Sequence, residues 1–314
     1  DVYKRQASAF LECNSGLVMQ VIDAPEKKES LLGPVLLASA GVLFFCMLDA
    51  VMKTQALAMG AYSATFWRAA MGAVFASALY LPNRPQLATG RVLRLHITRG
   101  VLTAFMMLFL FWSLTQLPLA QAVGLSFVAP IVALYLAAPM LGEQITRGAK
   151  IAAVLGFGGV VIIGGEDMFQ MRDDSSLLGI AAVLIFAVMY ALNIILQRKQ
   201  ALVARPTEIA CYQNVIMTCI LALGAPFAIT LPADVVQWTA ASAAGVLAVI
   251  SLILLSIAYS KAEAQALVSV EYTAFIWAAL FGWLFFAEPV SAGTILGTAL
   301  IITGCIVSTR KAKA

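Results

Sequence analysis

Long apolar runs separated by short polar connections fill the chain beyond its first 30 residues. A helix of about 20 apolar residues is long enough to cross the hydrocarbon core of a bilayer. Lipid offers backbone N–H and C=O groups no partner, so we expect each run to be helical. By this criterion the sequence predicts ten spans, near 33–57, 62–81, 96–115, 118–140, 148–165, 177–197, 208–230, 238–259, 264–286 and 291–308.

The five-span pattern occurs twice in the sequence. Ala120-Gln121-Ala122 recurs as Ala264-Gln265-Ala266, and Glu143 recurs as Glu288. Because five is an odd number, the second copy must enter the membrane from the opposite side. Inverted repeats of this kind are typical of secondary transporters, whose substrate sites lie near the bilayer midplane between the halves. We therefore predict an all-α polytopic membrane protein with ten transmembrane helices, arranged as two inverted five-helix repeats around a central cavity.

The predicted organisation has four parts. Residues 1–30 form an N-terminal tail, and we exclude 1–18 from the fold because Met19 is a plausible natural start. The first repeat covers 31–165, the second 177–308, and a basic tail 309–314. Basic residues concentrate at the even-numbered connections and in the last tail, so the positive-inside rule places both termini in the cytoplasm. We expect a multi-pass protein of the cytoplasmic (inner) membrane.

Composition agrees with this class. Hydrophobic residues make up 62% of the chain, charged residues 11%, and the mean hydropathy is +0.93, whereas a soluble domain carries roughly 25% charged residues. Five single cysteines and one histidine provide no metal-ligand spacing, so we expect no metal site and no cofactor. Connection residues account for the net charge of +4, and no nucleic-acid partner is predicted.

Two polar pairs stand at matching places in the first span of each repeat. Asp49 and Lys53 are four residues apart and share a helix face, and Asn193 and Gln197 occupy the equivalent positions. Inversion places the first pair toward the outside and the second toward the cytoplasm. One interpretation makes Asp49 and Lys53 part of the cavity wall near an outer gate. The alternative is an intrahelical ion pair, with Lys53 reaching toward the interface.

Two further charges lie within predicted spans. Arg68 is a candidate to neutralise Asp49 or to attract an anionic group of a substrate, and its alternative role is a structural tie between helices. Glu271 is a candidate proton-coupling residue or a binder of a cationic group. The alternative for Glu271 is a salt bridge to Arg99.

Aromatic and amide side chains complete the candidate site. Aromatic residues in the spans provide stacking walls for a planar ligand, although helical spacing also suits simple packing. Amides in the second repeat form an inner polar cluster or bond across helices. The aromatic candidates are Trp112, Tyr190, Tyr259, Tyr272 and Trp277, and the further amides are Gln213 and Asn214.

Other repeated positions are expected to be structural. Glu143 and Glu288 end the fourth and ninth spans, where each carboxylate can cap the helix that follows. Small residues form stripes along the fifth and tenth spans. These stripes suit close packing inside the fold or the seam of a homodimer. They comprise Gly148, Ala152, Gly156, Gly293 and Gly297.

The sequence resembles the EamA group of the drug/metabolite transporter superfamily over residues 33–308. The resemblance rests on the 5+5 layout, the turns LGEQITRGAK and FAEPVSAGTILG, and the segments FWRAAMGAVF and RGVLTAFMMLFLFWSLTQLPLAQA. Members often carry a proline within the first helix of each hairpin. Pro130 matches that position, but Ala274 stands there in the second repeat, and Glu271 replaces a residue that is usually apolar or small.

The resemblance implies a carrier whose central cavity opens alternately to either side and moves a small organic metabolite. VEYTAFIWAALFGWLFFAEP is similar to members that handle S-adenosylmethionine-like or riboflavin-like metabolites, so uptake of these stands beside amino acid or drug efflux. Nothing resembles an ATP-binding motif, so ion coupling or exchange would drive transport. The main alternative is a membrane subunit that binds a ligand without moving it. An enzyme is disfavoured because convergent catalytic groups are missing from the sequence.

Overall fold

The computed structural model describes residues 32–83, 87–129, 131–133, 135, 147–169, 174–261, 267 and 270–310. All of these except Leu32 belong to one compact unit, Gly33–Ala314. The predicted N-terminal tail, most of the C-terminal tail, Pro130 and Glu143 lie outside the described residues. Every regular element described is a helix: α2 (Leu32–Met59), α3 (Ala61–Tyr80), η1 (Leu81–Asn83), α4 (Gly90–Ser113), α5 (Leu119–Ser126), α7 (Arg147–Phe169), α8 (Asp174–Ala201), α9 (Pro206–Ala222), α10 (Ala225–Ala228), α11 (Val235–Lys261), α13 (Ala274–Phe286) and α14 (Ala292–Arg310).

The helices have membrane character. Four stretches of the described chain are long and apolar enough to cross a bilayer, namely Leu32–Met59, Gly90–Ser113, Leu177–Ala201 and Val235–Lys261. Shorter apolar helices accompany them, among them Ala274–Phe286 and Ala292–Gly304. The all-helical, polytopic membrane class is therefore confirmed. The count of ten spans stays a prediction.

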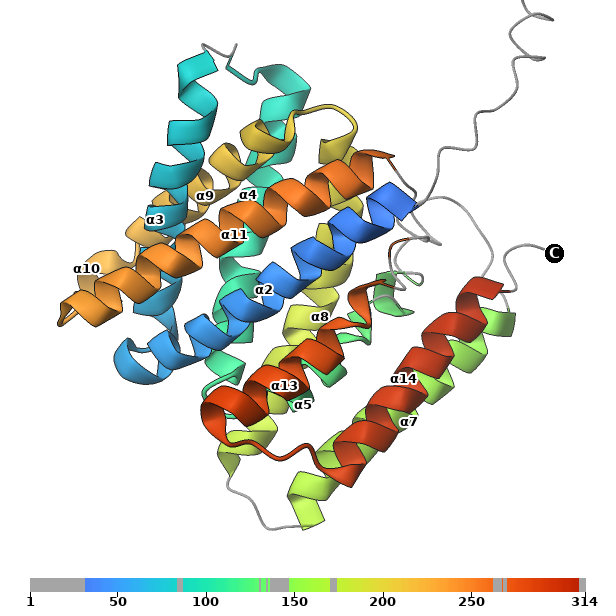
Figure 1. Cartoon of the computed structure of the whole chain (residues 1–314). Helices are drawn as coiled ribbons and strands as arrows, with labels where there is room; N and C mark the ends of the chain where they lie inside the picture. Colours follow the sequence, from blue (N-terminus) through green and yellow to red (C-terminus); the bar gives the residue numbers. More distant parts are fainter. Residues whose placement is uncertain are drawn as a thin grey trace, which may run out of the picture. The chain divides into compact units, whose positions relative to one another are not determined.

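Equivalent helices of the two repeats pack against each other. α3 lies against α9, α5 against α13, and α7 against α14. Figure 1 shows α7 and α14 side by side and running in opposite directions, as an inverted repeat requires. α4 also packs on α8 and α9, and α11 packs on α3. The two repeats are therefore interleaved, and the core is shared between them.

Glycines allow the close approach of α7 and α14. A Cβ atom added to Gly159 would lie 2.5 Å from the backbone oxygen of Gly297, and one added to Gly297 would lie 2.6 Å from the oxygen of Gly159. One added to Gly156 would meet the Ile131 side chain at 2.6 Å. Gly156 and Gly297, two members of the predicted stripes, thus face neighbours within the chain. A homodimer seam stays a prediction.

Both hairpin helices are interrupted at equivalent places. α5 ends at Ser126 and is followed by a turn at Phe127, while a turn at Tyr272 and Thr273 precedes α13. Hydroxyl groups bond back to carbonyls three residues earlier, from Ser126 to Val123 and from Thr273 to Val270, each at 2.7 Å. The predicted spans 118–140 and 264–286 are therefore not continuous helices.

Only one of these breaks has a proline near it in the sequence. Pro130 lies four residues after Ser126, and a proline cannot donate a hydrogen bond to the carbonyl four residues earlier. The second repeat has Ala274 instead, yet the turn is retained. The rings of Phe127 and Tyr272 lie edge to face with centroids 5.3 Å apart, so the two breaks meet inside the protein.

Candidate functional site

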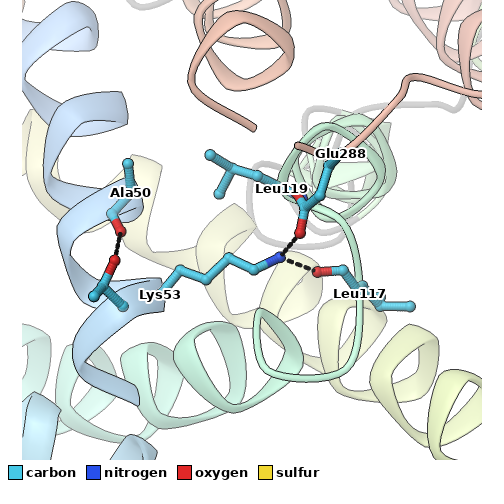
Figure 2. A network of polar contacts seen from close by, with 6 residues as sticks. Ala50, Lys53, Leu117, Leu119 and Glu288 are labelled. Carbon is cyan, nitrogen blue, oxygen red and sulfur yellow. Dashed lines mark hydrogen bonds and ion pairs between the residues drawn. The ribbon is translucent and has the colours of Figure 1, made fainter. Parts of the chain in front are cut away.

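Lys53 lies at the centre of a network that joins the two repeats (Figure 2). Its Nζ donates to the carbonyl oxygen of Leu117 at 2.7 Å and forms an ion pair with the Glu288 carboxylate. The other carboxylate oxygen of Glu288 accepts from the backbone N–H of Leu119 at 2.9 Å. The Lys53 ammonium also lies 5.1 Å from the ring centroid of Phe286. We call these five residues the Lys53 network.

The backbone after α13 aims Glu288 at the first repeat. Ala287 adopts the left-handed conformation with φ of 52°, and its N–H bonds back to the oxygen of Trp283 at 3.2 Å. Gly282 leaves room for the carboxylate, because a Cβ there would lie 3.2 Å from a Glu288 oxygen. The chain therefore turns back at Ala287, and Glu288 points toward the start of α5.

Two expectations about this region are wrong. Lys53 does not form an intrahelical ion pair with Asp49, since its partner is Glu288 from the other repeat. Glu288 does not cap the helix that follows it. Ser291 caps α14, because its hydroxyl accepts from the N–H of Thr294 at 3.0 Å, and Glu288 instead caps α5.

A first polar cavity lies between the repeats. It offers about 70 Å³ to water-sized molecules and draws its lining from α2, α3, α4, α8, α9 and α11. The guanidinium of Arg68 lies beside it, within 2.9 Å of the sulfur of Met217 and 5.9 Å from the ring centroid of Phe111. We call it the Arg68 chamber. Its polar lining includes Arg68, Arg99, Thr103, Tyr190, Asn193, Gln197, Gln213, Asn214 and Ser251.

A second cavity of about 70 Å³ shares a wall with the first, since Phe45 and Tyr190 line both. It is called the Asp49 chamber here. Glu271 accepts hydrogen bonds from the hydroxyl of Tyr190, at 3.3 Å, and from the hydroxyl of Tyr259. The lining includes Phe45, Cys46, Asp49, Ser126, Phe127, Phe186, Tyr190, Glu271 and Tyr272.

The proposed salt bridge between Glu271 and Arg99 is also wrong. Arg99 is 2% exposed and donates from Nε to the Asn193 side-chain oxygen at 2.9 Å and from a terminal nitrogen to Gln200 at 2.6 Å. Gln200 donates to His96 at 2.7 Å, and His96 contacts the Glu208 carboxylate at 3.1 Å. We call His96, Arg99, Asn193, Gln200 and Glu208 the Arg99 network. It joins α4 of the first repeat to α8 and α9 of the second.

The structure brings most of the candidate residues together. Tyr259 lies behind Glu271 as a hydrogen-bond donor, and Lys53 lies in its own network. Tyr259 and two further aromatic candidates line neither chamber. Trp112 is 39% exposed on an apolar groove beside Phe105, and Trp277 stacks on Phe281. The chamber-lining candidates are Asp49, Arg68, Tyr190, Asn193, Gln197, Gln213, Asn214, Glu271 and Tyr272.

Sequence reasoning missed two kinds of residue. One apolar span carries three polar residues at helical spacing, namely His96, Arg99 and Thr103. This spacing places them on one helix face, and it could have indicated the Arg99 network. Glu288 was recognised only as a cap. Its pairing with Lys53 joins residues that are 235 positions apart in the sequence, so no local pattern indicates it.

The sequence profile of the EamA-like transporter family matches residues 32–165 and, a second time, residues 177–310. The chain belongs to this family. Membership in the EamA-like transporters makes it a multi-pass membrane protein and a transporter of small molecules rather than an enzyme.

Relatives of this EamA-like chain are named as transporters of different compounds. The chain is 27% identical over 280 residues to the pseudopaline exporter CntI of Pseudomonas aeruginosa, and the matched region covers 89% of this chain and 96% of that protein. It is 28% identical over 292 residues to a riboflavin transporter of Rhizobium johnstonii, covering 90% and 92%. A solved structure with 20% identity, covering 89% of this chain and 97% of that one, superposes with a TM-score of 0.60, so the fold is shared.

Proposed function

We propose that the protein is a secondary active transporter that moves a small organic metabolite across the cytoplasmic membrane by alternating access. The pair of charged chambers between the repeats carries this proposal. Charged side chains are expensive inside a membrane and usually mark a transport pathway. Here Asp49, Arg68 and Glu271 line chambers at the interface of two inverted halves, where carriers of this architecture place their substrates.

Both ends of the pathway are closed by polar contacts between the repeats. The Lys53 network ties α2 and the start of α5 to Glu288, two residues beyond the end of α13, and the Arg99 network ties α4 to α8 and α9. A carrier that alternates must break one closure while it keeps the other. We propose that the Lys53 network closes the outside and the Arg99 network closes the cytoplasmic side, with both chain termini in the cytoplasm.

Cavity size supports an occluded conformation. Each chamber has room for a handful of water molecules, whereas metabolite pockets hold roughly 300 Å³ or more. A larger cleft of about 420 Å³, lined by Leu57, Gln116 and Pro118, lies directly against Lys53 and Glu288. Separation of that ion pair would join the cleft to the interior, so we assign the first opening movement to this point.

Glu271 is the proposed proton-coupling residue. Its carboxylate faces the Asp49 chamber and is held by two tyrosine hydroxyl groups that can adjust to a bound or a released proton. A proton bound here would be exposed to whichever side the chamber opens. Transport that depends on a pH gradient is the expected consequence.

The test is flux into liposomes that contain the purified protein. Radiolabelled riboflavin, S-adenosylmethionine and phenylalanine represent the substrate classes that the sequence and the relatives suggest. Saturable uptake that protein-free liposomes lack, and that responds to an imposed pH gradient, is the expected result. A protein that binds one of these compounds saturably but moves none of the three would instead be a ligand-binding or assembly subunit.

A further inference from the structure

We propose that the substrate is a zwitterion, whose anionic group is bound at Arg68 and whose cationic group is bound at Asp49. The inference rests on the proposed function and specifies its substrate class. It follows from the separation of charge between the two chambers. Arg68 and Arg99 line one chamber, and Asp49 and Glu271 line the other.

The Arg68 chamber presents a buried donor suited to an anion. Arg68 is 5% exposed, and its Nε is buried without a hydrogen-bond partner among the described residues. Among the described residues its guanidinium contacts the sulfur of Met217, a weak acceptor, and lies over the Phe111 ring. Arg99 already donates to Asn193 and Gln200. Arg68 is therefore the cation that a carboxylate can reach, and guanidinium–carboxylate hydrogen bonds are among the strong ones.

The Asp49 chamber presents a buried acceptor suited to a hydrogen-bond donor. Asp49 is 5% exposed, and its Oδ1 is buried without a hydrogen-bond partner in the described part of the chain. Glu271 differs, because both of its oxygens accept from tyrosine hydroxyl groups. An ionised carboxylate can only accept hydrogen bonds. An ammonium group is the ligand chemistry that satisfies Asp49 in both charge and hydrogen bonding.

Arg68 and Asp49 are arranged to bind the two ends of one molecule. Phe45 and Tyr190 line both chambers, so a ligand lying along these rings can reach Arg68 at one end and Asp49 at the other. Arg68 and Asp49 form no ion pair with each other in the described structure. The two side chains attract each other without direct contact. A ligand with only one charge would neutralise one of them and leave the other without its counter-charge, which is strongly unfavourable for a buried group. The chambers therefore select against singly charged analogues.

The test uses matched sets of three compounds with the purified full-length protein in detergent. Phenylalanine, 4-aminobutyrate and 6-aminohexanoate vary the distance between ammonium and carboxylate, and each is compared with its N-acetyl derivative and its methyl ester. Acetylation removes the cation and esterification removes the anion. Thermal unfolding across a concentration series gives the apparent dissociation constant for each compound. In at least one set the dissociation constant of the zwitterion should be at least about tenfold lower than that of either derivative. This difference corresponds to about 1.4 kcal/mol of binding free energy.

Charge-specific variants make the assignment residue by residue. Arg68→Gln should abolish the preference for the free acid over the ester, and Asp49→Asn should abolish the preference for the free amine over the acetylated form. Arg94→Gln, at an exposed position on α4, is the matched control and should preserve both preferences. If the variants do not fold, the comparison of derivatives on the wild-type protein still decides the question.

The outcomes separate this inference from the proposed function. A derivative that binds as tightly as its zwitterion in every set overturns the inference, and so does a series in which no compound binds. Riboflavin flux without zwitterion selectivity would leave the carrier intact and remove only the substrate class. Zwitterion selectivity without flux of the bound compound would support the recognition and overturn transport.

Discussion

The ion pair between Lys53 and Glu288 offers a double-mutant cycle with three variants, Lys53→Met, Glu288→Gln and the combined change. The Lys53 side chain is 6% exposed and that of Glu288 is 21% exposed. Methionine keeps most of the lysine's apolar stem, and glutamine keeps an oxygen for the N–H of Leu119. The variants therefore remove charge with little loss of volume.

The expected magnitudes follow from burial. Breaking a fully buried ion pair by removing one partner costs about 3–5 kcal/mol, while exposed pairs contribute about 0–1 kcal/mol. Glu288→Gln leaves the Lys53 ammonium buried with the Leu117 oxygen and the Phe286 ring but no counter-charge, so we expect a loss of stability of about 2–3 kcal/mol. Lys53→Met leaves the Glu288 carboxylate without its cation, but this carboxylate is partly exposed and still accepts from the N–H of Leu119. We therefore expect a smaller loss of stability, about 1–2 kcal/mol. The combined variant has no unpaired charge, so the coupling energy should be about 1–2 kcal/mol.

The assay is the free energy of unfolding in mixed micelles, followed by helical circular dichroism as denaturing detergent is added. Lys261→Met, at an exposed lysine at the end of α11, is the control for loss of a positive charge and should change stability by less than about 0.5 kcal/mol. If the two single effects simply add in the combined variant, the side chains do not interact, and the proposed closure at this end of the pathway would be refuted.

Three further predictions concern packing, the Arg99 network and coupling. Gly159→Ala should destabilise the protein by about 1–3 kcal/mol in the same unfolding assay, because backbone oxygen cannot move away from a Cβ atom, and the new atom would lie 2.5 Å from the oxygen of Gly297. Arg99→Gln should lower the free energy of unfolding by about 2–3 kcal/mol, because the buried side-chain oxygens of Asn193 and Gln200 lose their hydrogen-bond donor. Glu271→Gln should change stability little, because an amide can still bond to both tyrosines, but it should flatten the dependence of flux on pH.

Matched variants test these three predictions. Gly158→Ala lies in the same helix and meets only the flexible tip of Leu300 at 3.3 Å, so a loss as large as that of Gly159→Ala would contradict the packing argument. Arg94 is exposed on the same helix as Arg99. If Arg94→Gln lowered stability as much as Arg99→Gln, the buried hydrogen bonds of Arg99 would contribute nothing to stability. Unchanged pH dependence in Glu271→Gln, with flux retained, would remove the proton-coupling role.

The sequence alone determined the class of this protein and its repeated plan. Apolar runs of membrane length force helices because lipid cannot satisfy backbone polar groups, and that rule acts on each segment separately. The repeat was visible for the same reason, since Glu143 and Glu288 occupy equivalent local positions. Most of the polar chamber lining was also foreseeable, because polar residues such as Asp49 and Glu271 stand out within apolar spans.

Only the tertiary structure decided which partner each polar group takes. Lys53 has Asp49 one turn away, yet it pairs with Glu288 because the left-handed Ala287 turns the chain toward α5. Likewise the second hairpin helix is interrupted without a proline, where Thr273 bonds back to Val270. Local patterns fix which segments enter the membrane. Partner choice depends on distances between residues far apart in the chain, and these exist only after the interleaved repeats have packed.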